Sequence, residues 1–127
     1  MFGIEIAELK KDVLLYGKEF VKETGAYLVL KGAPTIIFTP SGEALINTTG
    51  NTGLAKFGTG DVLTGTIAGF LSQLKNAEKA AVAGVYLHSL AADLLVNEFT
   101  EFGYTATDLI KKLPAAIKFL KSSFKHP

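Results

Sequence analysis

Residues 56–65, KFGTGDVLTG, join a glycine-rich loop to an apolar helical pattern and organise the rest of the chain. Gly58 and Gly60 flank a threonine, and Asp61 follows directly. The first turn of an α-helix has N–H groups without intrahelical partners and a partial positive charge of about half a unit. The stretch is therefore either a capped helix start and nothing more, or an anion-binding turn that contains an acid/base residue.

The loop before this junction favours the anion-binding hypothesis. Residues 48–60, TTGNTGLAKFGTG, hold four of the chain's 13 glycines, more than a helix cap requires. The turn Gly58, Thr59, Gly60 could hold a phosphate or oxyanion with backbone N–H groups, and Asp61 could act as a general base beside it. Two familiar phosphate motifs are excluded, because Thr59 stands where a Walker A lysine belongs and Leu63 where a dinucleotide fingerprint needs glycine.

The remaining sequence reads as one helix, two or three strands and three further helices. A helix is expected from Ile4 to Glu23, with Gly25 as its C-terminal glycine. Short strands are expected at 27–30, 35–39 and 43–47, and helices at 61–74, 77–99 and 108–122. Thr105 or Thr107 is expected to cap the last helix.

The balance of these elements predicts the fold class. The helix at 77–99 is apolar nearly all round and should be central. So few strands make a thin sheet for so many helices, which favours an α/β fold that is part of a larger domain.

Several side chains are predicted to be structural. The expected packing residues of the helix at 61–74 are Val62, Ile67, Phe70, Leu71 and Leu74. Gly65 and Gly69 are expected to allow close contact with a neighbouring helix or sheet. The aromatic residues expected in the core are Tyr86, Phe99 and Phe102. His88 and Asp93 lie five residues apart on one helix, so they should face different ways, with His88 on the helix surface or a pocket wall.

Composition narrows the function classes. The formal charge is +1, and all 13 basic residues are lysine, which gives no support for binding to nucleic acid or a membrane. Without arginine, a phosphate site must rely on backbone N–H groups, lysine and a metal ion. The chain contains no cysteine, begins without a signal-peptide pattern and fits a cytoplasmic setting.

A second glycine-containing segment follows the first expected strand. Residues Lys31, Gly32, Ala33, Pro34 and Thr35 could place an ammonium and backbone N–H groups beside a nucleotide. From these residues alone, a simple turn with a solvated lysine is favoured.

Taken together, the ordered set KGAPT (31–35), GNTG (50–53) and GTGDVL (58–63) resembles the NAD(P)H-hydrate dehydratases of the ribokinase-like superfamily, often labelled carbohydrate kinases. The likeness continues to residues 105–120 and covers nearly the whole chain. It implies a ribokinase-like three-layer α/β fold, of which residues 1–127 would form the C-terminal half of the domain, with a sheet of two to four strands and about four helices.

The resemblance implies repair of hydrated NADH or NADPH with ADP or ATP and Mg²⁺. The hydrate hydroxyl is phosphorylated and phosphate is then eliminated. Asp61 would contact the substrate hydroxyl as the base, and Gly58, Thr59 and Gly60 would form the anion hole. Lys31 to Thr35, Asn51 and Gly60 would bind the nucleotide. The bacterial and archaeal members favour ADP.

The chain departs from the family pattern in three ways. Thr52 replaces a proline, Lys56-Phe57 replaces a Thr-Gly pair so that Lys56 could add charge beside the phosphates, and the family's N-terminal half has no counterpart. The predicted partner is therefore that missing half or a second copy of the chain. Two other functions stay open: a small-molecule kinase of the same superfamily, such as a hydroxyethylthiazole-type kinase, and a non-catalytic ADP-binding module that self-associates.

Overall fold

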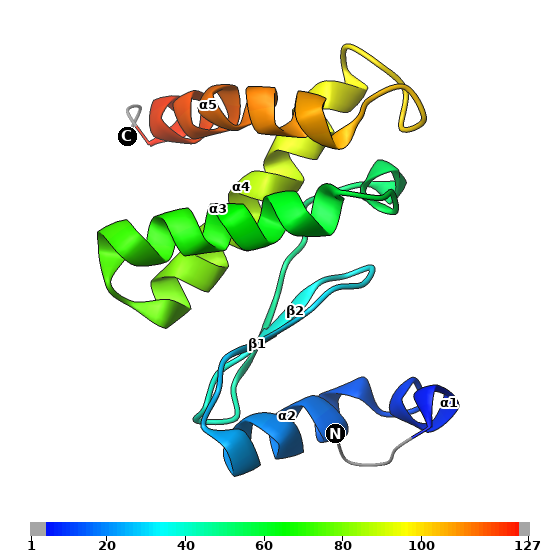
Figure 1. Ribbon diagram of the computed structural model, residues 1–127, viewed down its shortest axis with the longest axis vertical. Helices are drawn as coiled ribbons and strands as arrows, with labels where there is room; N and C mark the ends of the chain where they lie inside the picture. Colours follow the sequence, from blue (N-terminus) through cyan, green and yellow to red (C-terminus); the bar gives the residue numbers. More distant parts are fainter. Residues whose placement is uncertain (1–4, 125–127) are drawn as a thin grey trace. The chain divides into compact units, whose positions relative to one another are not determined.

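The computed structural model describes residues 5–124 (Figure 1). Its elements in chain order are α1 (Ile6–Leu9), α2 (Val13–Thr24), β1 (Leu28–Leu30), β2 (Ile36–Phe38), β3 (Ala44–Ile46), the 3-10 helix η1 (Thr52–Leu54), α3 (Thr59–Leu74), α4 (Ala77–Val96) and α5 (Ala106–Ser123). The chain divides into two compact units, Met1–Asn47 and Thr48–Pro127, and each is described by itself.

The N-terminal unit begins with two helices where the sequence predicted one. The expected start at Ile4 lies outside the described residues, and the helical run is interrupted before Asp12. Asp12 is the N-cap of α2 and accepts a 3.0 Å hydrogen bond from the backbone N–H of Leu15. This cap begins a new helix, so a continuous helix over the whole stretch was a wrong prediction. Gly25 ends α2 with a φ of 67°, as expected.

The three strands form an antiparallel meander in the order β1-β2-β3, which confirms the expected small sheet and the hairpin return. Ile37 pairs with Val29 on one side and with Leu45 on the other. The turn between β2 and β3 needs a glycine, because Gly42 has a φ of 88°. Phe38 and Val21 are fully buried where α2 packs on β2.

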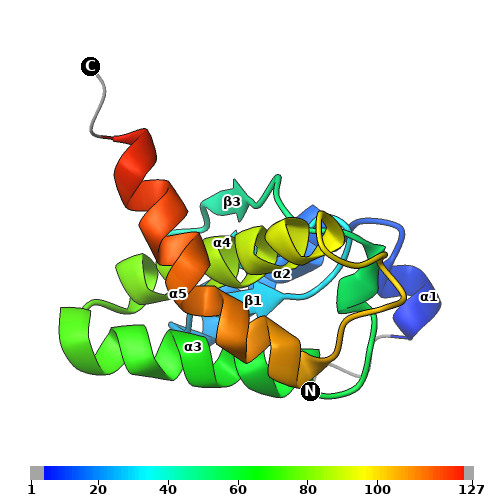
Figure 2. The ribbon, with the colours of Figure 1, turned by 90° about the horizontal axis from the view of Figure 1, so that it is seen from above.

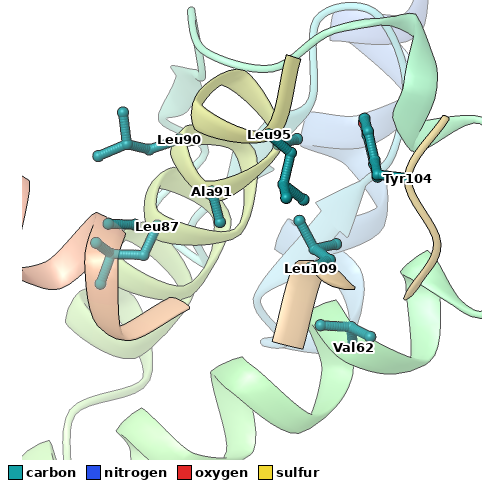
Figure 3. Packing of buried hydrophobic residues seen from close by; sticks show 9 residues of the cluster. Val62, Leu87, Leu90, Ala91, Leu95, Tyr104 and Leu109 are labelled. Atoms are coloured by element: carbon teal, nitrogen blue, oxygen red, sulfur yellow. The ribbon is translucent and has the colours of Figure 1, made fainter. Parts of the chain in front are cut away.

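The C-terminal unit is built around α4, as its apolar pattern predicted. This helix contacts both α3 and α5, and α5 also contacts α3 (Figure 2). The core lies between the three helices and includes Val62, Leu87, Leu95, Tyr104 and Leu109 (Figure 3). By length and composition α4 could cross a membrane, but most of its apolar window is buried, as in a core helix.

The close contact between α3 and α4 depends on a glycine that the sequence pattern did not single out. A Cβ on Gly84 would lie 3.1 Å from the Cα of Ile67, so only glycine allows this approach. The prediction for Gly65 and Gly69 was wrong, since a Cβ on either would meet no described atom within 4 Å.

Several other packing predictions are also corrected. Phe99 and Phe102 are exposed, because α4 ends at Val96 and leaves them in the connecting loop. Leu71 and Leu74, near the end of α3, are exposed as well. Val62 is buried as predicted.

The last helix begins with a capping box. Thr105 accepts a hydrogen bond from the backbone N–H of Asp108, and the Asp108 carboxylate accepts one from the Thr105 N–H. Thr105 is therefore the cap, in place of Thr107. The described residues thus form an α/β chain with a three-stranded sheet, as expected, and five α-helices where about four were predicted.

Candidate active site

The turn Gly58–Asp61 lies at the start of α3. Gly58 is the N-cap and has a φ of 84°, a left-handed conformation that favours glycine. The first backbone N–H that donates within α3 is that of Val62, which bonds to the Gly58 carbonyl. The N–H groups of Thr59, Gly60 and Asp61 therefore have no partner inside the helix and can donate to an anion.

Thr59 anchors this turn from inside the unit. It is fully buried, and its hydroxyl lies 2.7 Å from the Leu54 carbonyl oxygen and 2.9 Å from that of Lys56. Its own carbonyl oxygen lies 2.9 Å from Nε2 of His88. The threonine is thus held by both its side chain and its main chain, and the backbone before α3 is held with it.

Asp61 lies in the first turn of α3. Its side chain is exposed and receives no hydrogen bond from the described residues. A carboxylate in the first turn of a helix is stabilised by the partial positive charge there. This arrangement leaves a free acceptor beside three free donors, the combination that a base acting next to an anion hole requires.

The loop before η1 is held by Asp93 of α4. One oxygen of this carboxylate accepts a 2.8 Å hydrogen bond from the Gly50 N–H, and the other accepts a 3.0 Å bond from the side-chain amide of Asn51. The Asn51 side-chain oxygen accepts from the Gly53 N–H at 3.0 Å and from the Tyr104 hydroxyl at 2.8 Å. These side-chain hydrogen bonds of Asn51 therefore hold the shape of the loop.

The glycines of this loop are explained by two different constraints. Gly50 has a φ of 106°, which a side chain strongly disfavours. Gly53 is buried, and a Cβ there would lie 2.6 Å from the Glu101 carbonyl oxygen. The GNTG pattern is thus required by backbone conformation at its start and by close packing at its end.

Lys56 connects the same region to the segment that follows α4. Its ammonium donates to the carbonyl oxygens of Glu101 at 2.7 Å and Tyr104 at 2.8 Å, and it lies 4.3 Å from the centre of the Tyr104 ring. The ammonium is therefore used inside the unit, and its role as extra charge beside the phosphates stays a prediction.

Tyr104 is buried at the junction of these contacts. Burial, followed by the negative charges of Asp93 and Glu101, raises the pKa of Tyr104 to about 12. The phenol therefore stays protonated over the whole neutral range and remains a hydrogen-bond donor to Asn51.

The segment Lys31–Thr35 belongs to the N-terminal unit. It connects β1 to β2, and Lys31, Gly32, Ala33 and Pro34 are exposed. The Thr35 hydroxyl donates to the Gly32 carbonyl oxygen at 3.3 Å, and the bond between Ala33 and Pro34 is cis. The segment is an ordered exposed turn, compatible with nucleotide contact, and its binding role stays a prediction.

Metal ligands are sparse in the described part of the chain. Residues 5–124 contain no group of three or more His, Asp or Glu side chains placed to hold an ion. Mg²⁺ usually keeps several waters and is bound through one or two carboxylates together with substrate phosphates. The donor set therefore fits a Mg²⁺ ion that arrives with a nucleotide, not one held by a protein cage.

An apolar groove of about 600 Å³ also lies in the C-terminal unit. The residues that line it come from α4, from α5 and from the residue that follows α5: Glu78, Lys79, Val82, Ala83, Tyr86, Leu120 and Phe124. None of them belongs to the turn at the start of α3.

Sequence reasoning missed three residues that shape the candidate site. His88 was expected on the helix surface or a pocket wall, but it is buried against Thr59. Asp93 and Tyr104 were given no role. The signal that could have marked Asp93 is a single carboxylate in the apolar second half of α4, because such a group needs a partner when it is shielded from water.

Comparisons with known proteins point to one family. The family model for NAD(P)H-hydrate dehydratase matches residues 1–115. A bifunctional NAD(P)H-hydrate repair enzyme of Thermofilum pendens is 38% identical over 97% of this chain and 24% of its own length. The ADP-dependent (S)-NAD(P)H-hydrate dehydratase of Bacillus subtilis is 39% identical over 93% of this chain and 43% of its own length.

A solved structure supports the same assignment. The ADP/ATP-dependent NAD(P)H-hydrate dehydratase of Bacillus subtilis, co-crystallised with ATP and Mg²⁺, superposes on 94% of this chain with a TM-score of 0.89. That match covers 44% of the bacterial chain, so this sequence spans less than half of the relatives it matches. The expected α/β fold is confirmed by this likeness. The match over residues 1–115 shows that the chain belongs to the NAD(P)H-hydrate dehydratase family.

Proposed function

We propose that this chain carries the anion hole and the catalytic base of an ADP- or ATP-dependent NAD(P)H-hydrate dehydratase. The observation that carries the proposal is the turn at the start of α3, where the exposed carboxylate of Asp61 stands beside three N–H groups that have no intrahelical partner. Family membership supplies the substrate class.

In the proposed reaction, Asp61 accepts the proton of the hydrate hydroxyl while that oxygen attacks the terminal phosphorus of the nucleotide. The bond from this phosphorus to its bridging oxygen breaks, and the nucleotide leaves with one phosphate fewer. The N–H groups of Thr59, Gly60 and Asp61 stabilise the charge on the transferred phosphoryl group. The same donors then hold the phosphate as its bond to the ring carbon breaks, a ring proton leaves and the nicotinamide double bond is restored. One nucleotide phosphoryl group is consumed for each cofactor repaired.

The nucleotide is proposed to contact Lys31 to Thr35, Asn51 and Gly60. The exposure of the first four residues and the ordered turn at Thr35 support this role in the N-terminal unit. The support for Asn51 is weaker, because its side chain is committed to Asp93, Gly53 and Tyr104. We therefore propose that Asn51 supports the nucleotide through the backbone of its loop. Mg²⁺, bound through phosphate oxygens and water, would supply charge neutralisation.

The length of the chain leads to a proposal about partners. Residues 1–127 are proposed to be the C-terminal half of the catalytic domain, because the Bacillus subtilis dehydratase is matched over only 43% of its length. Large apolar side chains such as Ile110, Phe119 and Phe124 are exposed on α5 or at its end. We propose that apolar surface of this kind is covered by the missing half or by a second copy. A strictly monomeric species in light scattering would contradict self-association.

The absence of cysteine supports a cytoplasmic location.

The test is recovery of NADPH absorbance from its hydrate with ADP or ATP and Mg²⁺. Replacing the base in Asp61→Asn should lower kcat by about 10²–10⁴-fold, whereas Glu19→Gln, an exposed acid on α2, should leave it unchanged. Equal activity of wild type and Asp61→Asn would overturn the role of Asp61.

One observation favours a second candidate function. Because the chain covers less than half of its relatives, it could bind ADP without turning it over. A rise in melting temperature with ADP, in a chain that restores no NADPH, would favour this binding module. Accumulation of a stable phosphorylated alcohol would instead indicate a small-molecule kinase.

A further inference from the structure

We infer that His88 is a positioning residue for the anion hole, acting through the peptide unit that joins Thr59 to Gly60. The inference rests on the proposed function of the Gly58–Asp61 turn. His88 lies in the middle of α4, is 2% exposed, and holds its Nε2 atom 2.9 Å from the Thr59 carbonyl oxygen.

The direction of this hydrogen bond follows from chemistry. A carbonyl oxygen can only accept, so Nε2 of His88 carries the proton and donates it. The imidazole contacts a backbone group inside the unit and so acts on the anion only indirectly. It is therefore distinct from Asp61, whose exposed carboxylate can reach a substrate hydroxyl.

The peptide unit transmits the effect because it is rigid. The Thr59 carbonyl and the Gly60 N–H belong to one planar group and point in opposite directions in a trans peptide. Holding the carbonyl at 2.9 Å therefore fixes the direction of the Gly60 N–H, which is one of the three donors left unbonded within α3. Donation to the carbonyl also polarises the peptide and strengthens its N–H as a donor by roughly 10–30%.

The Thr59 hydroxyl holds the turn in place from a second side. Its two carbonyl partners, on Leu54 and Lys56, belong to the backbone that leads into the turn. The turn is thus held from α4 through the main chain of Thr59 and from the preceding loop through its side chain. A histidine that only packs in the core would need a partner for its proton and nothing more. A positioning histidine should also change the Thr59 peptide and the affinity for the anion when its N–H donor is removed.

The experiment compares three variants of the 127-residue chain by NMR, with MgADP as the probe. His88→Leu removes the donor, and His88→Gln keeps a side-chain N–H that can reach the same carbonyl. Leu90→Ala, at a buried position two residues along α4, lowers stability without touching the turn. The first readout, without ligand, is the carbonyl carbon shift of Thr59. The second is the affinity for MgADP, followed at the Gly60 amide.

We expect His88→Leu to change the Thr59 carbonyl shift and to weaken MgADP binding about fivefold to tenfold, less than the roughly 10²–10³-fold effect of losing a whole oxyanion-hole donor. His88→Gln should return both values to within about twofold of wild type, and Leu90→Ala should keep the wild-type affinity despite a lower melting temperature.

Different results would contradict different claims. If wild type responds to MgADP at Gly60 and His88→Leu responds equally, or if the Thr59 shift does not change, His88 has no positioning role. If wild type shows no response at residues 58–61, the proposed function of the turn is wrong, whatever the Thr59 shift reports. Failure of His88→Gln to restore a function lost in a folded His88→Leu protein would mean that the ring fills space and does not position the donor.

Discussion

The carboxylate of Asp93 accepts a 3.0 Å hydrogen bond from the side-chain amide of Asn51, although the two residues lie 42 positions apart in the chain. Its second oxygen accepts from the Gly50 N–H. One side chain of the central helix therefore sets the conformation of the loop that leads into the candidate active site.

Replacing this carboxylate should weaken both the fold and the site. In Asp93→Ala, the part-buried side-chain amide of Asn51 and the backbone N–H of Gly50 lose a charged acceptor, so the free energy of unfolding should fall by about 1–3 kcal/mol. Urea denaturation measures this change. Glu98→Ala is the matched control, because Glu98 forms an exposed ion pair with Lys112 and such pairs contribute about 0–1 kcal/mol. Equal losses in the two variants would contradict the role of Asp93.

Two glycines of the same region should respond in opposite ways to alanine. Gly58→Ala forces a Cβ into a left-handed conformation and to within 3.0 Å of Ala106, so the free energy of unfolding should fall by about 1–2 kcal/mol. Gly65→Ala places a Cβ in open space within α3 and should stabilise the chain by about 0.5–1 kcal/mol. Thermal unfolding checks both, and a stable Gly58→Ala variant with normal ADP affinity would show that the turn does not need glycine.

Lys56 is expected to contribute more to the stability of the C-terminal unit than to the binding of phosphates. Lys56→Met removes two charge-assisted hydrogen bonds and the contact with the Tyr104 ring, so the free energy of unfolding should fall by roughly 2–4 kcal/mol. The exposed Lys118→Met variant serves as the control. If Lys56→Met kept its stability but lost ADP affinity in a salt-dependent way, Lys56 would be a phosphate ligand after all.

The phenol of Tyr104 predicts a loss of stability at alkaline pH. Its pKa is raised to about 12 in the folded chain, against about 10 when unfolded. The stabilisation is complete below about pH 10, because the phenol is protonated in both states, and is lost as the pH rises toward 12, since the unfolded chain releases the proton first. The stability difference between wild type and Tyr104→Phe should therefore shrink over this range. Tyr27→Phe, at an exposed position, should leave the pH dependence of wild type unchanged.

The elements and their ends could be read from the sequence because the signals are local. Gly25 and Thr105 mark helix ends through bonds that span three or four residues, and the turn at Gly42 connects adjacent strands. The break at Asp12 was missed because the apolar spacing continues across it. Phe99 and Phe102 were misplaced, since an apolar residue after a helix end has no packing direction in the sequence pattern.

The sequence by itself determined that residues 58–61 begin a helix with free N–H groups, because glycine conformation and the first turn of a helix are properties of neighbouring residues. It also determined the family, through three short motifs in a fixed order. The tertiary structure alone decided how the turn is held: Thr59 by His88, Asn51 by Asp93, and Lys56 by Tyr104. These partners are 29 to 48 positions apart, and only the packing of α4 and the loop after it brings them within hydrogen-bonding distance.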